Sequence, residues 1–215
     1  HIECTAMSTA KLGETFDIHT GGIEHIGVHH TNEIAQGYGA FSHNTANYWM
    51  HNAWLTLKDG KMSKSLGNVY TIQDLVKQGY DPMAFRYLVL MSHYRKGLTF
   101  SFDSLKAAQV ALEKLRNYKS DKVGEISKSY KKEFIEKISD DLATPEALAL
   151  VWKMMKSDLS AEDKWATLLD FDKVLGLELG KVKENEEIPK EILDLVEERK
   201  QAREAKDWAE SDRLR

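Results

Sequence analysis

The chain has 215 residues, of which 42% are hydrophobic and 30% are charged, a composition typical of folded globular proteins that excludes disordered and fibrous classes. Its 30 basic and 34 acidic residues give a net charge of −4. No apolar run approaches the roughly 20 residues that a membrane-spanning helix requires, and the first residues do not form a basic and then apolar leader. We therefore expect a cytoplasmic protein that does not bind membranes. The single cysteine, Cys4, excludes an internal disulfide and is expected to be a free thiol or a metal ligand.

The charges are unevenly distributed along the chain. Residues 1–57 carry a net charge of −4, residues 58–132 carry +8, and residues 133–215 carry −8. The central basic stretch is compatible with a site for phosphate or nucleic acid and equally with a solvated, lysine-rich surface.

The first 57 residues predict an α/β layer. Short hydrophobic runs at 15–18 and 54–57 favour strands, and residues 33–36 continue a helix that begins near His29. The order strand, helix, strand is typical of an α/β layer. The residues around Cys4 are expected to lie on a further strand.

Local signals predict helices in the remainder of the chain. Thr71 with Asp74 forms a capping box, and Asp81-Pro82 supplies an N-cap followed by proline, so helices are expected over about 72–78 and 82–93. Helical spacing predicts a further helix over 103–120 that buries four apolar residues: Leu105, Ala108, Leu112 and Leu115. Another helix is expected from Thr144-Pro145, and only helices are expected after Ser101.

The last part of the chain is expected to be a linker followed by a charged helix. Residues 181–189 are polar and acidic, which is typical of a linker. In the helix beyond it five residues line up along one side as a stripe, and Trp208 follows on a further turn or helix. The stripe consists of Ile188, Ile192, Leu195, Arg199 and Ala202.

The most specific motif is the string Lys61-Met62-Ser63-Lys64-Ser65, which lies between Gly60 and Gly67. Two lysines and two hydroxyls on a glycine-bounded loop can fold over a triphosphate, and an ammonium that closes on the leaving pyrophosphate stabilises the transition state preferentially. We assign that role to Lys64. A charged hairpin loop is the structural alternative, and the full string followed by Leu66-Gly67-Asn68 argues against it.

A second constellation predicts a zinc site. His29 and Glu33 are four residues apart and so project from one helical face, and with Cys4 they offer an imidazole, a carboxylate and a thiolate. Zinc takes four ligands, so the fourth would come from another part of the protein, from solvent or from substrate. Three other histidines are also candidate zinc ligands that their spacing does not exclude: His19, His25 and His30. The alternative is a capping histidine and a small buried cysteine.

Several segments carry a resemblance to a known family. The first are His1-Ile2-Glu3-Cys4, residues 16–22, His29-His30 with residues 32–36, Tyr48-Trp49-Met50-His51, and residues 61–68. In order and spacing they resemble the cysteinyl-tRNA synthetases. Further segments that look like the same family are Tyr80-Asp81-Pro82, Arg86-Tyr87, Ser92-His93-Tyr94-Arg95, residues 141–147, Ala202-Arg203 and residues 206–209. The resemblance covers nearly the whole chain.

The resemblance implies an α/β fold, namely the C-terminal half of a class I Rossmann-type catalytic domain followed by an all-helical region. Residues 1–70 would be the second half of the nucleotide-binding domain with its lysine loop, 71–120 a helical stem-contact region, and 121–215 a helical bundle that leads toward the anticodon-binding part. Cys4, His29 and Glu33 match three of the family's four zinc ligands. The fourth, an early cysteine, and the first ATP signature would lie outside this chain, whose first methionine is Met7.

The resemblance also implies which residues contact ATP, with two departures from the family pattern. Lys61 and Lys64 are expected to be catalytic, and ATP is expected to bind residues 61–65 with Gly21, Gly22 and Glu24. Where the family has three glycines and then Asp, this chain has Thr20-Gly21-Gly22-Ile23-Glu24, and Glu24 can accept the ribose hydroxyls. Around the histidine pair it has Gly27-Val28 and Thr31 in place of Phe-Pro and Glu.

The implied activity is ATP-dependent formation of cysteinyl-adenylate and transfer of the cysteinyl group to tRNA(Cys), with Zn²⁺ selecting the substrate thiol and Mg²⁺ accompanying ATP. The protein is expected to be a monomer, and this chain alone is expected to be inactive and to bind zinc weakly. Arg86, Arg95 and Lys96, with the lysines of 106–132, are candidate contacts to the tRNA acceptor stem or are merely solvated. The alternatives are a cysteine–amino sugar ligase of the same fold, a non-catalytic zinc or RNA-binding module, and a simple zinc hydrolase.

Overall fold

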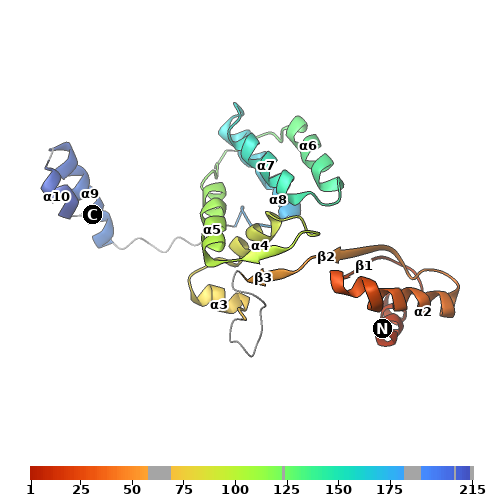
Figure 1. The fold of residues 1–215 in the computed structure, drawn as a ribbon. Coiled ribbons are helices and arrows are strands. Elements are labelled where there is room, and N and C mark those ends of the chain that lie inside the picture. The colour runs from red at the N-terminus through yellow and green to blue at the C-terminus, as the bar shows by residue number, and fades with distance from the viewer. Residues whose placement is uncertain (58–68, 123, 182–189, 206, 214–215) are drawn as a thin grey trace. The chain divides into compact units, whose positions relative to one another are not determined.

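A computed structural model describes residues 1–57, 69–122, 124–181, 190–205 and 207–213. The chain forms two compact units, residues 1–179 and 180–215, and each is described here by itself. The first unit contains a small α/β part and a helical part, which follow each other along the chain (Figure 1).

The α/β part consists of two parallel strands joined by a helix. Its elements are helix α1 (Ile2–Leu12), strand β1 (Phe16–Gly22), a 3₁₀ turn (Ile23–His25), a π-helical segment (Ile26–His30), helix α2 (Thr31–Phe41) and strand β2 (Ala46–Asn52). In the register of the two strands His19 lies opposite Trp49 and Gly21 lies opposite His51. Because side chains alternate along a strand, these four positions share one face of the sheet. On the other face Ile18 lies opposite Tyr48, and both side chains are exposed.

Most of the predictions for this part are confirmed, and one is wrong. A strand covers residues 16–18 and continues to Gly22, and helix α2 covers residues 33–36. Cys4, however, lies on helix α1 and not on a strand. The prediction failed because α1 has no buried apolar stripe: Thr5 is the only one of its residues, all of which the structure describes, that is fully buried. The hydrophobic periodicity that marks most helices is therefore missing from this segment.

The helical part begins with a second pair of parallel strands. Its elements are β3 (Leu55–Leu57), α3 (Ile72–Lys77), α4 (Pro82–Leu90), β4 (Leu98–Phe100), α5 (Phe102–Arg116), α6 (Lys128–Ser139), α7 (Thr144–Met155) and α8 (Ala161–Leu175). The predicted caps are confirmed: the Thr71 hydroxyl accepts a hydrogen bond from the backbone N–H of Asp74, and Asp81 accepts one from Met83. Every described element after Ser101 is a helix, as predicted.

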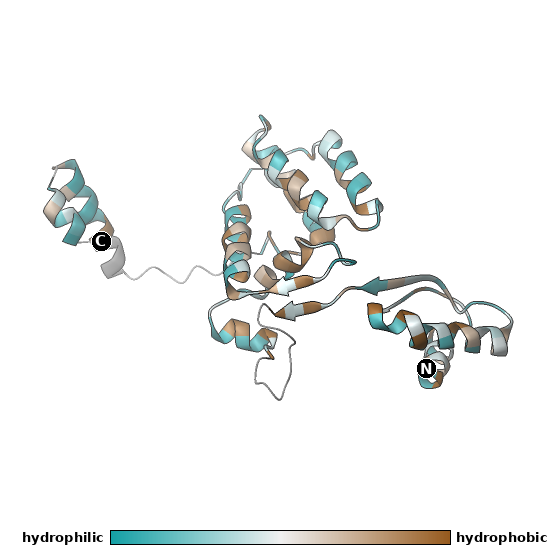
Figure 2. Ribbon diagram, in the orientation of Figure 1, coloured by the Kyte–Doolittle hydropathy of each residue, from teal (hydrophilic) through white to brown (hydrophobic). Residues whose placement is uncertain are grey.

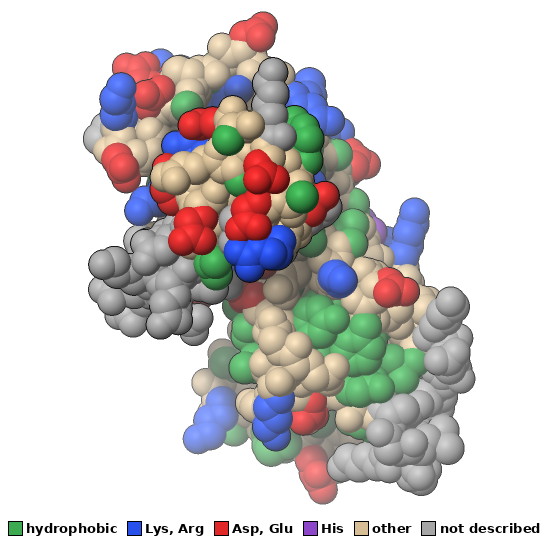
Figure 3. Space-filling model, turned by 90° about the vertical axis from the view of Figure 1, so that its left-hand side faces the viewer, with side chains coloured by type: hydrophobic (Ala, Val, Ile, Leu, Met, Phe, Trp, Pro, Cys, Tyr) green, Lys and Arg blue, Asp and Glu red, His purple; other side chains and the backbone are tan. Residues whose placement is uncertain are grey.

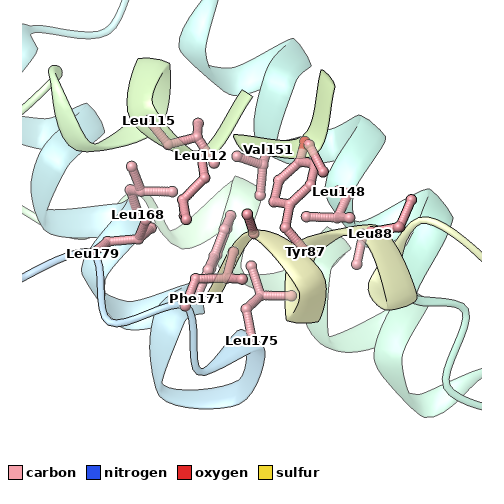
Figure 4. Packing of buried hydrophobic residues seen from close by; sticks show 14 of the residues in the cluster. Tyr87, Leu88, Leu112, Leu115, Leu148, Val151, Leu168, Phe171, Leu175 and Leu179 are labelled. Atoms are coloured by element: carbon pink, nitrogen blue, oxygen red, sulfur yellow. The ribbon is translucent and has the colours of Figure 1, made fainter. Parts of the chain in front are cut away.

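The hydrophobic core lies among α4, α5, α7 and α8 (Figure 4). The four α5 residues that helical spacing assigned to the core are all at most 1% exposed. The rings of Phe134 on α6 and Phe171 on α8 stack with centroids 4.1 Å apart, and the Trp152 indole N–H donates to the Tyr87 hydroxyl at 2.8 Å. Apolar side chains of neighbouring helices thus converge on one interior, which is also visible in the hydropathy of the ribbon (Figure 2).

A tight turn between α6 and α7 is tied to the loop after α4. Asp141 and Leu142 both have left-handed backbone angles, with φ of 50° and 56°. Residues other than glycine rarely adopt this conformation. The Asp141 carboxylate accepts a hydrogen bond from the Tyr94 hydroxyl at 2.6 Å and pairs with Arg95 at 3.0 Å. The same loop holds the end of the first sheet, because the Tyr94 carbonyl accepts from the N–H of Ala53 at 2.7 Å.

The second unit contains α9 (Lys190–Glu204) and α10 (Trp208–Arg213), mainly hydrophilic helices (Figure 2). They confirm the charged helix and the further helix at Trp208. The two helices are joined by a hydrogen bond from Arg199 to the carbonyl of Ser211 at 3.2 Å. Residues 182–189, which include most of the predicted linker and Ile188 of the predicted stripe, lie outside the described residues. None of the described helices is both long enough and apolar enough to cross a membrane.

Candidate metal and substrate site

The structure brings Cys4, His29 and Glu33 together from three neighbouring elements. Cys4 lies on α1, His29 on the π-helical segment and Glu33 in the first turn of α2. One ligand atom from each lies within 4.8 Å of the others. The spacing of four residues between His29 and Glu33 holds across the junction, because the chain stays helical from one segment into the next.

Glu33 is the centre of the group. Its side chain is 3% exposed, and its two oxygens face two different imidazoles: His29 Nε2 lies 2.8 Å from Oε1, and His19 Nε2 lies 3.1 Å from Oε2. Oε1 is buried and accepts no aligned hydrogen bond from the described residues. A buried carboxylate oxygen without a donor is costly unless a cation or a ligand group satisfies it.

These residues fit a zinc ion. A thiol, an imidazole and a carboxylate are all zinc ligands, and three protein ligands leave a fourth position for another group. The unsatisfied Oε1 of Glu33 lies 2.8 Å from His29 Nε2, and the two atoms do not form an aligned hydrogen bond. His19, His30 and Glu33 form a second group within 4.8 Å, so the buried carboxylate is shared between two sets of imidazoles.

The buried His30 and the half-buried His51 form an imidazole pair beside the ligand group. His30 Nδ1 lies 2.7 Å from His51 Nε2, and His30 is 4% exposed. Burial, together with the neighbouring imidazoles of His19 and then His51, lowers the pKa of His30 to about 4. His30 is therefore neutral at pH 7 and adds no positive charge beside Glu33.

Gly21 makes room for this pair. A Cβ at Gly21 would lie 2.6 Å from Cε1 and 2.9 Å from Nε2 of His30, closer than van der Waals contact allows. Packing against His30 thus explains why position 21 has no side chain.

The buried Nδ1 of His25 and Nε1 of Trp49 have no hydrogen-bond partner, and with Glu33 Oε1 they make three of the five such atoms in the described part of the chain. The concentration of unsatisfied polar atoms indicates a site for a polar ligand.

A cavity of about 300 Å³ opens next to this cluster. Trp49 and His51 of β2 form one side, and Tyr94 and Arg95, from the loop after α4, form another; the remaining lining residues are Ile23 and Ile26. The cavity combines aromatic surface, an imidazole and a guanidinium group, which suits a ligand that has both a flat ring and negative charge.

The structure describes only some of the residues that were predicted to bind ATP. Gly21 and Gly22 end strand β1, and the half-exposed carboxylate of Glu24 follows in the 3₁₀ turn, 3.7 Å from His25 Nδ1. The carboxyl end of a parallel strand is where open α/β sheets bind ligands. The loop with Lys61, Met62, Ser63, Lys64 and Ser65 lies outside the described residues.

Two of the candidate tRNA contacts have partners within the chain. Arg86 donates to the carbonyl of Leu175 at 2.6 Å, and Arg95 pairs with Asp141, whereas Lys96 is exposed. On the face shown in Figure 3, lysine and arginine side chains are scattered among acidic and hydrophobic ones and do not form one basic field.

Sequence reasoning missed Trp49 and His51 as members of the site. Their rings lie 5.0 and 4.9 Å from that of His30. The available signal was their spacing of two, which puts both side chains on one face if residues 46–52 form a strand, and that strand was not predicted.

The fold is that of a tRNA synthetase catalytic domain of class I. The fold of LeuRS from Agrobacterium radiobacter K84, in a ternary complex with tRNA and LeuAMS, superimposes with a TM-score of 0.54 at 19% identity over 76% of this chain and 26% of that one. The model of the tRNA synthetases class I (C) catalytic domain matches residues 1–110, and the chain belongs to this family.

Curated relatives of the chain are named cysteine–tRNA ligases. The chain is 45% identical to "Cysteine--tRNA ligase 1" of Burkholderia lata, over 100% of this chain and 47% of that protein. It is 39% identical to the cysteine–tRNA ligase of Caldicellulosiruptor saccharolyticus, over 100% of this chain and 51% of that protein. The chain thus spans about half the length of the curated relatives that it matches.

Proposed function

We propose that the whole protein is a cysteine–tRNA ligase. It joins the carboxylate of cysteine to the AMP part of ATP, which forms cysteinyl-adenylate and releases pyrophosphate, and it then transfers the cysteinyl group to tRNA(Cys). The observation that carries the proposal is the group of Cys4, His29 and Glu33, with a buried carboxylate oxygen that lacks a donor. The family and the names of the relatives support the same activity. The cysteine–amino sugar ligase, the non-catalytic module and the zinc hydrolase have no such support.

Cys4, His29 and Glu33 would hold Zn²⁺. When bound, zinc would supply a soft Lewis acid that favours the thiolate of cysteine over the hydroxyl of serine, so selection would occur in binding. Glu33 offers a carboxylate to a cation, and His30, whose pKa burial lowers to about 4, adds none of the positive charge that would oppose one. Of the three donors Glu33 is buried, whereas Cys4 and His29 are half-buried.

The remaining residues would bind and orient ATP. Glu24 would accept the ribose hydroxyls, and the backbone of Gly21 and Gly22 would approach the nucleotide, with Mg²⁺ on the phosphates. Lys61 and Lys64, with the flanking Met62, Ser63 and Ser65, would close over the triphosphate, and Lys64 would neutralise charge on the departing pyrophosphate.

The placement of tRNA and the state of the whole protein are further parts of the proposal. Residues 1–70 would bind the nucleotide, the helices of 71–120 would lie near the acceptor stem, and the helices of 121–215 would lead toward the anticodon-binding part. Lys96 and exposed lysines of α5 are the remaining candidates for phosphate contacts. The protein would act as a monomer in the cytoplasm.

Amino-acid-dependent exchange of pyrophosphate into ATP tests the proposal in the whole protein. We expect exchange with cysteine and not with serine, followed by charging of tRNA(Cys), and loss of cysteine-dependent exchange in Glu33→Gln. The exposed Glu14→Gln serves as the matched control and should keep full exchange. Exchange with cysteine that leads to ligation of an amino sugar and not to charged tRNA would establish the alternative ligase. No exchange with any amino acid, in protein that binds zinc and RNA, would establish the non-catalytic module.

A further inference from the structure

A partly buried side-chain hydrogen bond joins α1 to α2 beside the proposed metal ligands. The hydroxyl of Thr5 donates to Oε1 of Gln36 at 2.6 Å, and Thr5 is 6% exposed. Thr5 is the residue after Cys4, and Gln36 lies three residues beyond Glu33 on the same face of α2. The bond therefore connects the two helices next to the ligands that each contributes.

Among the described residues, Thr5 is the one side chain that α1 buries fully, and it lies next to Cys4. No residue of α1 other than Thr5, in a helix that the structure describes from end to end, is fully buried, and its large apolar residues Ile2, Met7 and Leu12 are 60–63% exposed. Sliding α1 by one residue along its axis would displace Cys4 by about 1.5 Å and rotate its side chain by about 100°. Either change would remove the thiol from reach of His29 and Glu33.

We propose that Thr5 and Gln36 are positioning residues for the metal site: their hydrogen bond sets the register of α1 on α2 and so holds the Cys4 thiol over His29 and Glu33. This role rests on the proposed zinc-dependent function. Residues that orient metal ligands without binding the metal typically change metal affinity by about 10–100-fold when they are mutated. The expected effect is thus on the affinity for metal and on the geometry of the thiolate bond, with little effect on the fold.

Zinc affinity of the whole protein, measured by competition with a chromophoric chelator, tests the proposal. Thr5→Val keeps the shape of the side chain and removes the hydroxyl, and Gln36→Met removes the acceptor at similar length. We expect each to weaken zinc binding by about 10-fold or more, and the double variant to be no weaker than either single one, because both break the same bond. Thr5→Ser restores the hydroxyl and should restore the affinity.

The matched control is Thr9→Val on the same helix. Its hydroxyl donates to the carbonyl of Thr5 at 2.8 Å, within α1, so its removal should not change zinc binding. Substitution by Co²⁺ gives a second readout: the thiolate-to-cobalt absorption should be reduced in Thr5→Val and full in Thr9→Val, while circular dichroism confirms that both variants are folded.

The outcomes separate this role from the function on which it rests. Wild-type zinc affinity and cobalt spectrum in folded Thr5→Val would overturn the positioning role and leave the metal site intact. Equal weakening in Thr9→Val would overturn it as well, because the effect would then belong to the helix and not to the bond. A wild-type protein that holds no stoichiometric zinc would overturn the metal site itself.

Discussion

Asp81 and Arg116 form a nearly buried ion pair that joins the start of α4 to the end of α5. Arg116 Nη1 lies 2.5 Å from Asp81 Oδ2, with 15% and 14% of the two side chains exposed, and the other carboxylate oxygen caps α4. Arg116 also donates to the carbonyl of Leu177, beyond α8. The guanidinium group of Arg116 thus connects three segments of the helical part.

Breaking this pair should be costly, because it leaves one charge buried without its partner. Asp81→Asn keeps an N-cap of equal quality, and we expect it to lower the free energy of unfolding by about 3 kcal/mol. Arg116→Met should have a similar effect, and the double variant should recover part of the loss. Urea denaturation measures these values. The exposed pair Lys132 and Glu136 is the control, since Lys132→Met should cost at most about 0.5 kcal/mol. Equal effects at both pairs would contradict the prediction.

Gly21→Ala should disturb the buried imidazoles. The new Cβ would lie 2.6 Å from His30 Cε1, so His30 must shift, and overpacking of this kind costs about 1–3 kcal/mol. Gly27→Ala, on the π-helical segment with nothing within 4 Å of its Cβ, should be neutral or stabilising by up to about 1 kcal/mol. Thermal unfolding of both variants decides the matter. Indistinguishable stabilities would show that Gly21 does not make room for His30.

Asp170 should make stability depend on acid pH. Hydrogen bonds from Lys173 and then Lys131 lower its pKa below the ordinary value, and its side chain is 9% exposed. The folded state therefore binds the proton less readily than the unfolded chain, so the stabilisation is present above the ordinary pKa of about 3.9 and is lost as the pH falls through the lower folded value.

The measurement for Asp170 is chemical denaturation of wild type and Asp170→Asn at a series of pH values. At pH 7 the variant should be less stable by about 1 kcal/mol, and the two curves should converge as the pH falls through the lowered pKa of Asp170. The exposed Asp121→Asn should parallel wild type throughout. A difference that stays constant down to pH 2 would assign the effect to packing and not to charge.

Lys64→Ala should lower the rate of cysteine activation by about 10²-fold or more without changing stability, because the ammonium acts on charge that develops in the transition state. Pyrophosphate exchange measures the rate, and Lys58→Ala, outside the string 61–65, is the control for loss of one positive charge. An unaltered rate in Lys64→Ala would remove this lysine from the mechanism.

The fold was most predictable where its signals are local. The Thr71–Asp74 and Asp81-Pro82 caps fixed the starts of α3 and α4 because the hydrogen bonds that define them join residues only two or three apart. Helix α1 gave no comparable signal, since its large apolar residues are exposed and its buried contact with α2 is made by the polar Thr5.

Spacing along one helix predicted the pair of His29 and Glu33, residue type and the resemblance added Cys4, and His19 stood among three further candidates. His29 and Glu33 could be paired because they are four residues apart. His19, Trp49 and His51 join them through the register of two parallel strands, and a register depends on pairing across 30 residues, which no local pattern of this sequence encodes.

The uncovered face of the first sheet also affects how this chain can be handled. Ile18 and Tyr48 lie side by side there, 55% and 68% exposed, and β1 and β2 each pair with one neighbour within the described residues. Open strand edges beside apolar side chains are templates for intermolecular pairing. When this chain is expressed by itself, self-association is therefore expected to begin at this sheet, and substituting Ile18 by lysine should raise the concentration at which the chain stays monodisperse.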